Sequence, residues 1–123
     1  MTRLLALALL ALAGCHPMYA GLEIRLYTST AEHVVVTDQQ IELTAGVAVA
    51  IEVLPISGNR REYDDDDLLD LRSEREDIVL AGPSERQGWF VLVGIAPGET
   101  CVAVVIDSER EDCIPARVTA PAG

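Results

Sequence analysis

Apolar and polar residues alternate along most of the chain after residue 21. Leu22, Ile24 and Leu26 are separated by charged residues, and Val49 and Ile51 belong to a second row of this kind. A period of two is typical of strands with one buried face. The pattern predicts an all-β fold, an antiparallel β-sandwich of about seven to nine strands, with no convincing helix in this region. The expected strands span residues 22–27, 33–36, 41–44, 47–54, 68–71, 78–80, 89–95, 102–106 and 114–119.

Turn-forming residues set the expected ends of these strands. Pro55, followed by Ser57-Gly58-Asn59, is expected to end the strand that begins at Val47. Ala96-Pro97-Gly98 predicts a tight turn, because proline fixes φ and glycine accepts a positive φ. The polar run Asp107–Asp112 is expected to form the loop of a hairpin between the last two strands.

The first fifteen residues have the composition of an export signal. Arg3 gives a positive start, and the apolar run Leu4–Ala13 rises only about 15 Å as a helix, roughly half of a hydrocarbon core. The run ends in Leu12-Ala13-Gly14-Cys15, which closely resembles the lipobox of bacterial lipoproteins. The resemblance implies a cleaved signal helix over residues 1–14, a lipid on Cys15, a short tether over residues 15–21 and a domain over residues 22–120. The alternative is an ordinary secretory signal with a chance cysteine.

Charge narrows the possible partners. The chain has a formal net charge of −11 and no lysine, so it lacks the basic surface that nucleic-acid binding requires. The same charge disfavours electrostatic attachment to anionic lipid, so membrane attachment is expected to depend on acyl chains. His16 follows the cysteine where an aspartate would favour inner-membrane retention in such lipoproteins, and this resemblance implies the outer membrane. A protein or cell-envelope partner is expected, of unidentified type.

The cysteine count fits export. If Cys15 carries lipid, Cys101 and Cys113 remain, and an oxidising compartment would favour their pairing. Both lie on the strand face opposite to Val102 and Val104, so the bond is expected to clamp one hairpin away from the core. A cysteine metal site is the alternative, but the two histidines are distant in sequence.

An aspartate run is the strongest candidate for a ligand site. Adjacent carboxylates supply the oxygen ligands that Ca²⁺ prefers, and no EF-hand spacing is present. Two alternatives stay open: a solvated, mutually repelling loop, which is what runs of like charge usually form, and a docking patch for a basic partner. The candidate Ca²⁺ ligands are Asp64, Asp65, Asp66, Asp67 and Asp70.

The sequence offers no catalytic motif. Neither G-x-S-x-G nor H-E-x-x-H occurs, and His33 is expected at a strand start on the surface. We therefore expect a non-catalytic protein without a cofactor. Trp89 and Phe90 occupy adjacent strand positions, so one should be core and the other exposed or at a sheet interface.

Two segments resemble bacterial Ig-like domains of group 2. Ile41–Gly46, followed by alternating residues and Pro55, is similar to the opening of that family. Val93–Val102 is similar to its "G-V-A-P-G-T-A-x-V" segment. Leu71 stands where the family usually has tryptophan, and the aspartate run and the cysteine pair are not typical of it. The resemblance covers roughly residues 35–120 and implies an Ig-like sandwich that serves as a spacer or adhesion module on bacterial surfaces.

Overall fold

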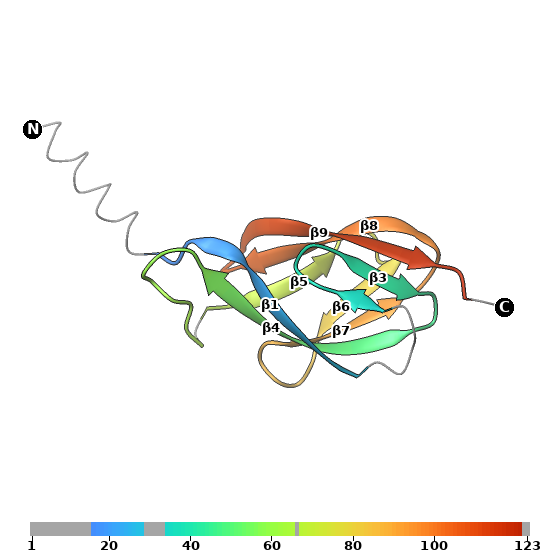
Figure 1. Ribbon diagram of the computed structural model, residues 1–123, viewed down its shortest axis with the longest axis horizontal. Coiled ribbons are helices and arrows are strands. Elements are labelled where there is room, and N and C mark those ends of the chain that lie inside the picture. Colours follow the sequence, from blue (N-terminus) through green and yellow to red (C-terminus); the bar gives the residue numbers. More distant parts are fainter. Residues whose placement is uncertain (1–15, 29–33, 66, 122–123) are drawn as a thin grey trace, which may run out of the picture.

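A computed structural model describes residues 16–28, 34–65 and 67–121 (Figure 1). Every regular element among these residues is a strand, and none is a helix long and apolar enough to cross a membrane. The expected signal helix and Cys15 lie outside the described residues. The strands are β1 (Tyr19–Thr28), β2 (Val35–Val36), β3 (Ile41–Thr44), β4 (Ala48–Ser57), β5 (Leu69–Ser73), β6 (Val79–Pro83), β7 (Trp89–Gly94), β8 (Gly98–Ile106) and β9 (Glu109–Thr119).

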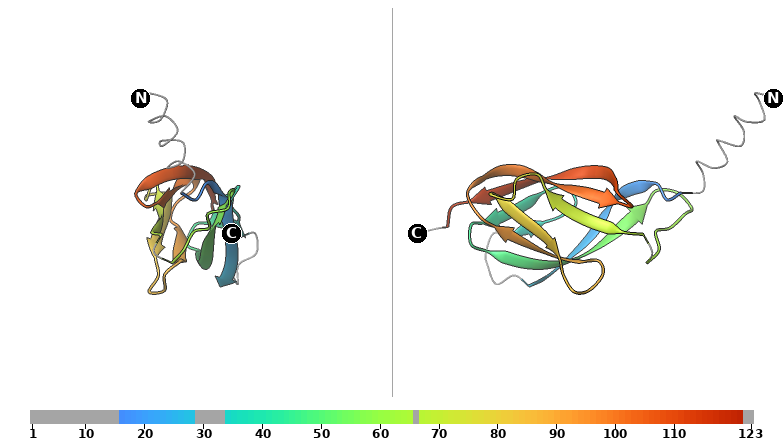
Figure 2. Two further views of the ribbon diagram at one scale, coloured as in Figure 1. Left: turned by 90° about the vertical axis from the view of Figure 1, so that its left-hand side faces the viewer. Right: turned by 180° about the vertical axis from the view of Figure 1, so that it is seen from behind.

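The strands form two sheets that pack face to face. One sheet has the order β1-β4-β7-β6, and the other has the order β2-β3-β9-β8-β5. The two layers are visible in the end-on view of Figure 2. The predicted all-β sandwich is therefore confirmed.

Alternating apolar positions from both sheets form the core. Val49, Ile51 and Val53 of β4 belong to the same buried cluster as Val102 and Val104 of β8, and all five are at most 1% exposed. Burial of one face of strands such as β4 is the physical reason that the period of two predicted them, whereas residues 102–106 of β8 are buried on both faces. The other buried core residues are Leu22, Ile41, Leu43, Leu71, Ile78, Val79, Phe90, Leu92, Ile106, Ile114, Ala116 and Val118.

One strand pair departs from the antiparallel expectation. β3 runs parallel to β9, with Ile41 opposite Ala116 and Thr44 opposite Thr119, whereas the other pairs are antiparallel. Parallel neighbours cannot be joined by a tight hairpin, and these two strands lie far apart in sequence. Local patterning therefore gives no signal for this pair.

The first strand begins earlier than expected. β1 starts at Tyr19, which pairs with Ser57, so Tyr19–Gly21 belong to the sheet although they were expected to be tether. The residues before it are also held, because the Gly58 N–H donates to the Met18 carbonyl at 2.7 Å. The Asn59 Nδ2 group donates to the His16 carbonyl at 2.8 Å. The described chain is thus fixed to the domain from His16 onward.

β4 and β6 each contain a proline, and Pro55 of β4 was expected to end its strand. β4 continues through Pro55 to Ser57, and β6 ends at Pro83. Pairing with β7 ends at Glu52, so Pro55 has a neighbour only on the β1 side, and β6 is an edge strand. Proline is tolerated at such edges because no ladder hydrogen bond is lost.

The turn between β8 and β9 is much shorter than the expected loop. Ile106 pairs with Glu109, so the turn consists of Asp107 and Ser108, with φ values of 50° and 70°. Most of the polar run Asp107–Asp112 is therefore strand, and its charged side chains face solvent. Two successive residues with positive φ fit the twist of a hairpin but strain non-glycine residues.

We expect Ser108→Gly to stabilise the protein by about 0.5–1 kcal/mol. Glycine removes the left-handed strain at this position, and the larger entropy of the unfolded chain offsets part of the gain. Urea denaturation of the variant and the wild type measures the difference. Asp107 is not the residue to replace, since its Oδ1 accepts a hydrogen bond from the Leu68 N–H at 2.8 Å. An unchanged or lower midpoint would show that the turn is not strained.

Candidate functional site

The two cysteines on the last hairpin are joined. Cys101 of β8 and Cys113 of β9 form a disulfide with a Cα–Cα distance of 5.5 Å, on the face away from Val102 and Ile114. They are not direct partners in the ladder, because Cys101 lies opposite Pro115 and Cys113 opposite Ala103. The bond therefore crosses the hairpin diagonally.

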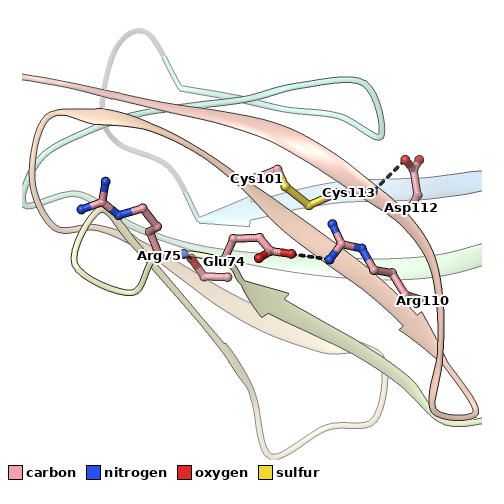
Figure 3. The surroundings of a disulfide bond; sticks show 7 residues. Glu74, Arg75, Cys101, Arg110, Asp112 and Cys113 are labelled. Atoms are coloured by element: carbon pink, nitrogen blue, oxygen red, sulfur yellow. Dashed lines mark hydrogen bonds and ion pairs between the residues drawn. A yellow bond between two sulfur atoms is a disulfide. The ribbon is translucent and has the colours of Figure 1, made fainter.

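Polar groups surround this disulfide (Figure 3). Glu74 lies beside it and forms an ion pair with Arg110, and the Glu74 N–H donates to the Cys101 carbonyl at 3.0 Å. Among the described residues, potential metal ligands gather at Glu74, Cys101 and Cys113. Because both sulfurs are in the disulfide, neither supplies a thiolate ligand. These contacts connect the residue that follows β5 to both strands of the hairpin.

The aspartate run is divided among several environments. Asp70 lies in β5 and pairs with Arg72 at 2.9 Å. Asp67 folds back on the run, where its Oδ2 accepts the Asp64 N–H at 2.8 Å. Within the described part of the run, no three carboxylates meet as closely as the group around the disulfide does. Asp66 lies outside the described residues. Calcium binding stays a prediction.

A carboxyl pair forms where the run meets the β8–β9 turn. The Asp64 N–H favours the ionised form of Asp67, but burial and the neighbouring Asp107 carboxyl outweigh it and raise the pKa of Asp67. The turn is held here by the Asp107 N–H, which donates to the Leu68 carbonyl at 2.9 Å. Two carboxyl groups in contact disfavour the simultaneous ionisation of both.

The same segment lines an open cavity of about 440 Å³. One wall comes from the final half of β4, another from residues 63–69, and a third from the loop between β6 and β7. Gln87 of that loop donates to the Asp65 carbonyl, which joins the two loops. The lining residues are Val53, Leu54, Pro55, Tyr63, Asp64, Asp65, Asp67, Leu68, Leu69, Gln87 and Gly88.

The aromatic pair divides between the two faces of its sheet. Phe90 is 2% exposed in the core, and Trp89 is half-buried on the outer face. The ring of Tyr27 lies 4.3 Å from the Trp89 ring, and the Arg86 guanidinium lies 5.7 Å from the Trp89 ring centroid. The opposite-face prediction is confirmed. Trp89 thus has an aromatic and a cationic neighbour within the protein.

Sequence reasoning missed three residues of the cavity region. Tyr63 and Asp107 were not singled out, and Leu68 was read only as part of a strand or turn. Leu68 gave no signal in the sequence, because it was expected inside a strand and its 69% exposure is seen only in the structure. Asp107 gave no signal either, because its approach to Asp67 depends on the pairing of β5 with β8.

Solved structures with a similar fold are domains of S-layer proteins. A structure of the S-layer protein SbsC, domains 5-6, has a TM-score of 0.56 and 12% identity, covering 88% of this chain and 47% of that one. The crystal structure of the S-layer protein rSbsC(31-844) has a TM-score of 0.58 and 12% identity, covering 88% of this chain and 14% of that one. This chain thus spans less than half of either protein, and the likeness shows the fold.

No protein-family model and no curated protein matches the chain. The resemblance to group 2 bacterial Ig-like domains and the lipobox therefore stay predictions. The segments 41–55 and 93–102, which resemble the Ig-like family, implied a two-sheet sandwich, and this is the fold observed.

Proposed function

We propose that this protein is a lipid-anchored module of the bacterial envelope with a structural or binding role and no catalytic activity. The observation that carries the proposal is the arrangement of the first described residues. They follow Cys15 directly and are hydrogen-bonded to the sandwich from His16 onward. A lipid on Cys15 would hold this end of the domain against the bilayer.

The long axis of the sandwich supports a projecting role. The described chain enters at one end, beside the loop after β4, and reaches Thr119 of β9 at the other end (Figures 1 and 2). A lipid at the first end would leave the opposite end, with β9 and the turn before β8, pointing away from the membrane. The S-layer domains of similar fold support a place at the cell surface. We propose the outer membrane, because His16 follows the cysteine.

Replacement of the proposed anchor tests the function. We expect wild-type protein to sediment with outer membranes and to stay there after a high-salt wash, because acyl chains are insensitive to salt. Cys15→Ser should release most of the protein into the soluble envelope fraction. Density-gradient fractionation measures both, and mass spectrometry of the wild type should show acyl mass on Cys15.

A matched cysteine control separates anchoring from folding. The double variant Cys101→Ser/Cys113→Ser loses two cysteines but keeps Cys15, so it should stay with the membrane. Retention of Cys15→Ser on washed membranes, or absence of acyl mass on wild-type protein, would contradict the proposed anchor.

A further inference from the structure

The cavity at the aspartate run combines apolar and anionic walls. Leu54 and Leu68 stand at its surface, 43% and 69% exposed, and Val53 and Leu69 lie deeper. Asp64, Asp65 and Asp67 complete the lining. A volume of about 440 Å³ is within the range of ligand pockets, roughly 300–1,000 Å³.

The charged side chains among the described lining residues are all acidic. Of the described residues that line the cavity, none is basic. Asp67 contacts the Asp107 carboxyl as well, so two acidic groups meet at one side of the site. A positively charged group placed here would be attracted by the acidic lining.

The exposed leucines add a second requirement. A small inorganic cation would satisfy the carboxylates but leave Leu54 and Leu68 in water. An arginine or lysine side chain satisfies both walls, because its methylene stem packs on apolar surface while its charged end reaches carboxylates. Tyr63 also lines the cavity, and aromatic rings attract guanidinium groups.

We propose that this cavity is a docking site for an arginine- or lysine-bearing segment of a partner protein. The stem of the basic side chain packs between Leu54 and Leu68, and its head is held by Asp65 and Asp67. The proposal deepens the binding role proposed above and rests on it. The cavity lies in the half of the sandwich where the chain enters, so the partner segment would lie near the membrane.

A peptide titration tests the site. The probe is a capped pentapeptide of alternating leucine and arginine, added to full-chain ¹⁵N-labelled protein purified from the cell fraction that it occupies. We expect saturable shifts of the amides of Leu54, Leu68 and Gly88, and none with a peptide that has glutamate in place of arginine. Ca²⁺ alone and anionic phosphatidylglycerol vesicles are titrated in parallel.

Matched variants distinguish binding of the peptide in the cavity from its general attraction to an acidic protein. Leu54→Ser should weaken binding about fivefold through loss of buried apolar area, whereas Leu80→Ser, equally exposed on β6, should leave it unchanged. Asp65→Asn/Asp67→Asn should weaken binding about tenfold. Glu42→Gln/Glu76→Gln, with the same charge change on other elements, should have a small effect.

Three results would overturn the proposal. Equal weakening by both charge variants would indicate non-specific attraction. Shifts of the same amides with Ca²⁺ alone would indicate a metal site, and shifts with vesicles alone would indicate a lipid surface. None of these three results depends on Cys15. The peptide titration can therefore fail while the fractionation test still supports the lipid anchor, and the fractionation test can fail while the titration still supports the docking site.

Discussion

Replacement of Cys101 and Cys113 by alanine should lower the free energy of unfolding by about 3 kcal/mol. The disulfide closes a loop of 12 residues, and removing this constraint gives the unfolded chain a larger conformational entropy. Packing losses should be small, because both cysteines are half-buried on the outer face of the sheet. For a domain whose total stability is about 5–15 kcal/mol, this is a large share. Urea denaturation of both proteins measures the loss.

Reduction provides the control for this prediction. A reductant should lower the urea midpoint of the wild type by the same amount and leave the double variant unchanged. Alkylation without reductant should modify neither Cys101 nor Cys113 in the wild type. A loss below about 1 kcal/mol, or alkylation of the native wild type at these residues, would contradict the stabilising role of the bond.

The alternation of side chains between the two faces of a strand explains which parts of the fold the sequence predicts. Val102 and Val104 are buried and Cys101 faces outward because neighbouring residues of a strand point to opposite faces. This local rule also divides Phe90 from Trp89. It needs no knowledge of which strands are neighbours.

The errors arise where structure depends on neighbours distant in sequence. Pro55 remains in β4 because β7 stops short of it, and the composition around Pro55 carries no information about β7. The run Asp107–Asp112 has the composition of a loop, yet solvent-facing charged side chains are equally compatible with the exposed face of β9. The parallel pair β3–β9 is invisible to any local pattern for the same reason.

In the candidate site, too, the sequence predicts the residue types but not which of them come together. Composition reveals abundant carboxylates, but their use depends on geometry. Pairing of β5 with β8 brings Asp107 toward Asp67, and β4 supplies Leu54 to the apolar wall. The acidic run alone left three possibilities open: a calcium ligand set, a solvated loop and a docking patch for a basic partner. The cavity adds the apolar surface that favours a basic side chain over a bare cation.

Gly94→Ala should destabilise the protein by about 3 kcal/mol. Gly94 ends β7 where the chain crosses from β3 of one sheet to β4 of the other. Its N–H donates to the Val47 carbonyl at 2.9 Å, and its carbonyl accepts the Gly46 N–H at 2.8 Å. A Cβ at Gly94 would lie 2.5 Å from the Thr44 carbonyl oxygen, so backbone must shift and these hydrogen bonds must weaken.

Gly82→Ala is the matched control, since Gly82 lies in the neighbouring strand β6 of the same sheet. A Cβ there would meet no atom within 4 Å, and alanine restricts the unfolded chain more than glycine does. We expect its urea midpoint to equal or slightly exceed that of the wild type. Equal midpoints for the two variants would contradict the close crossing at Gly94. A selective loss in Gly94→Ala would show that contact between the β3–β4 crossing and β7 fixes how the two sheets are joined.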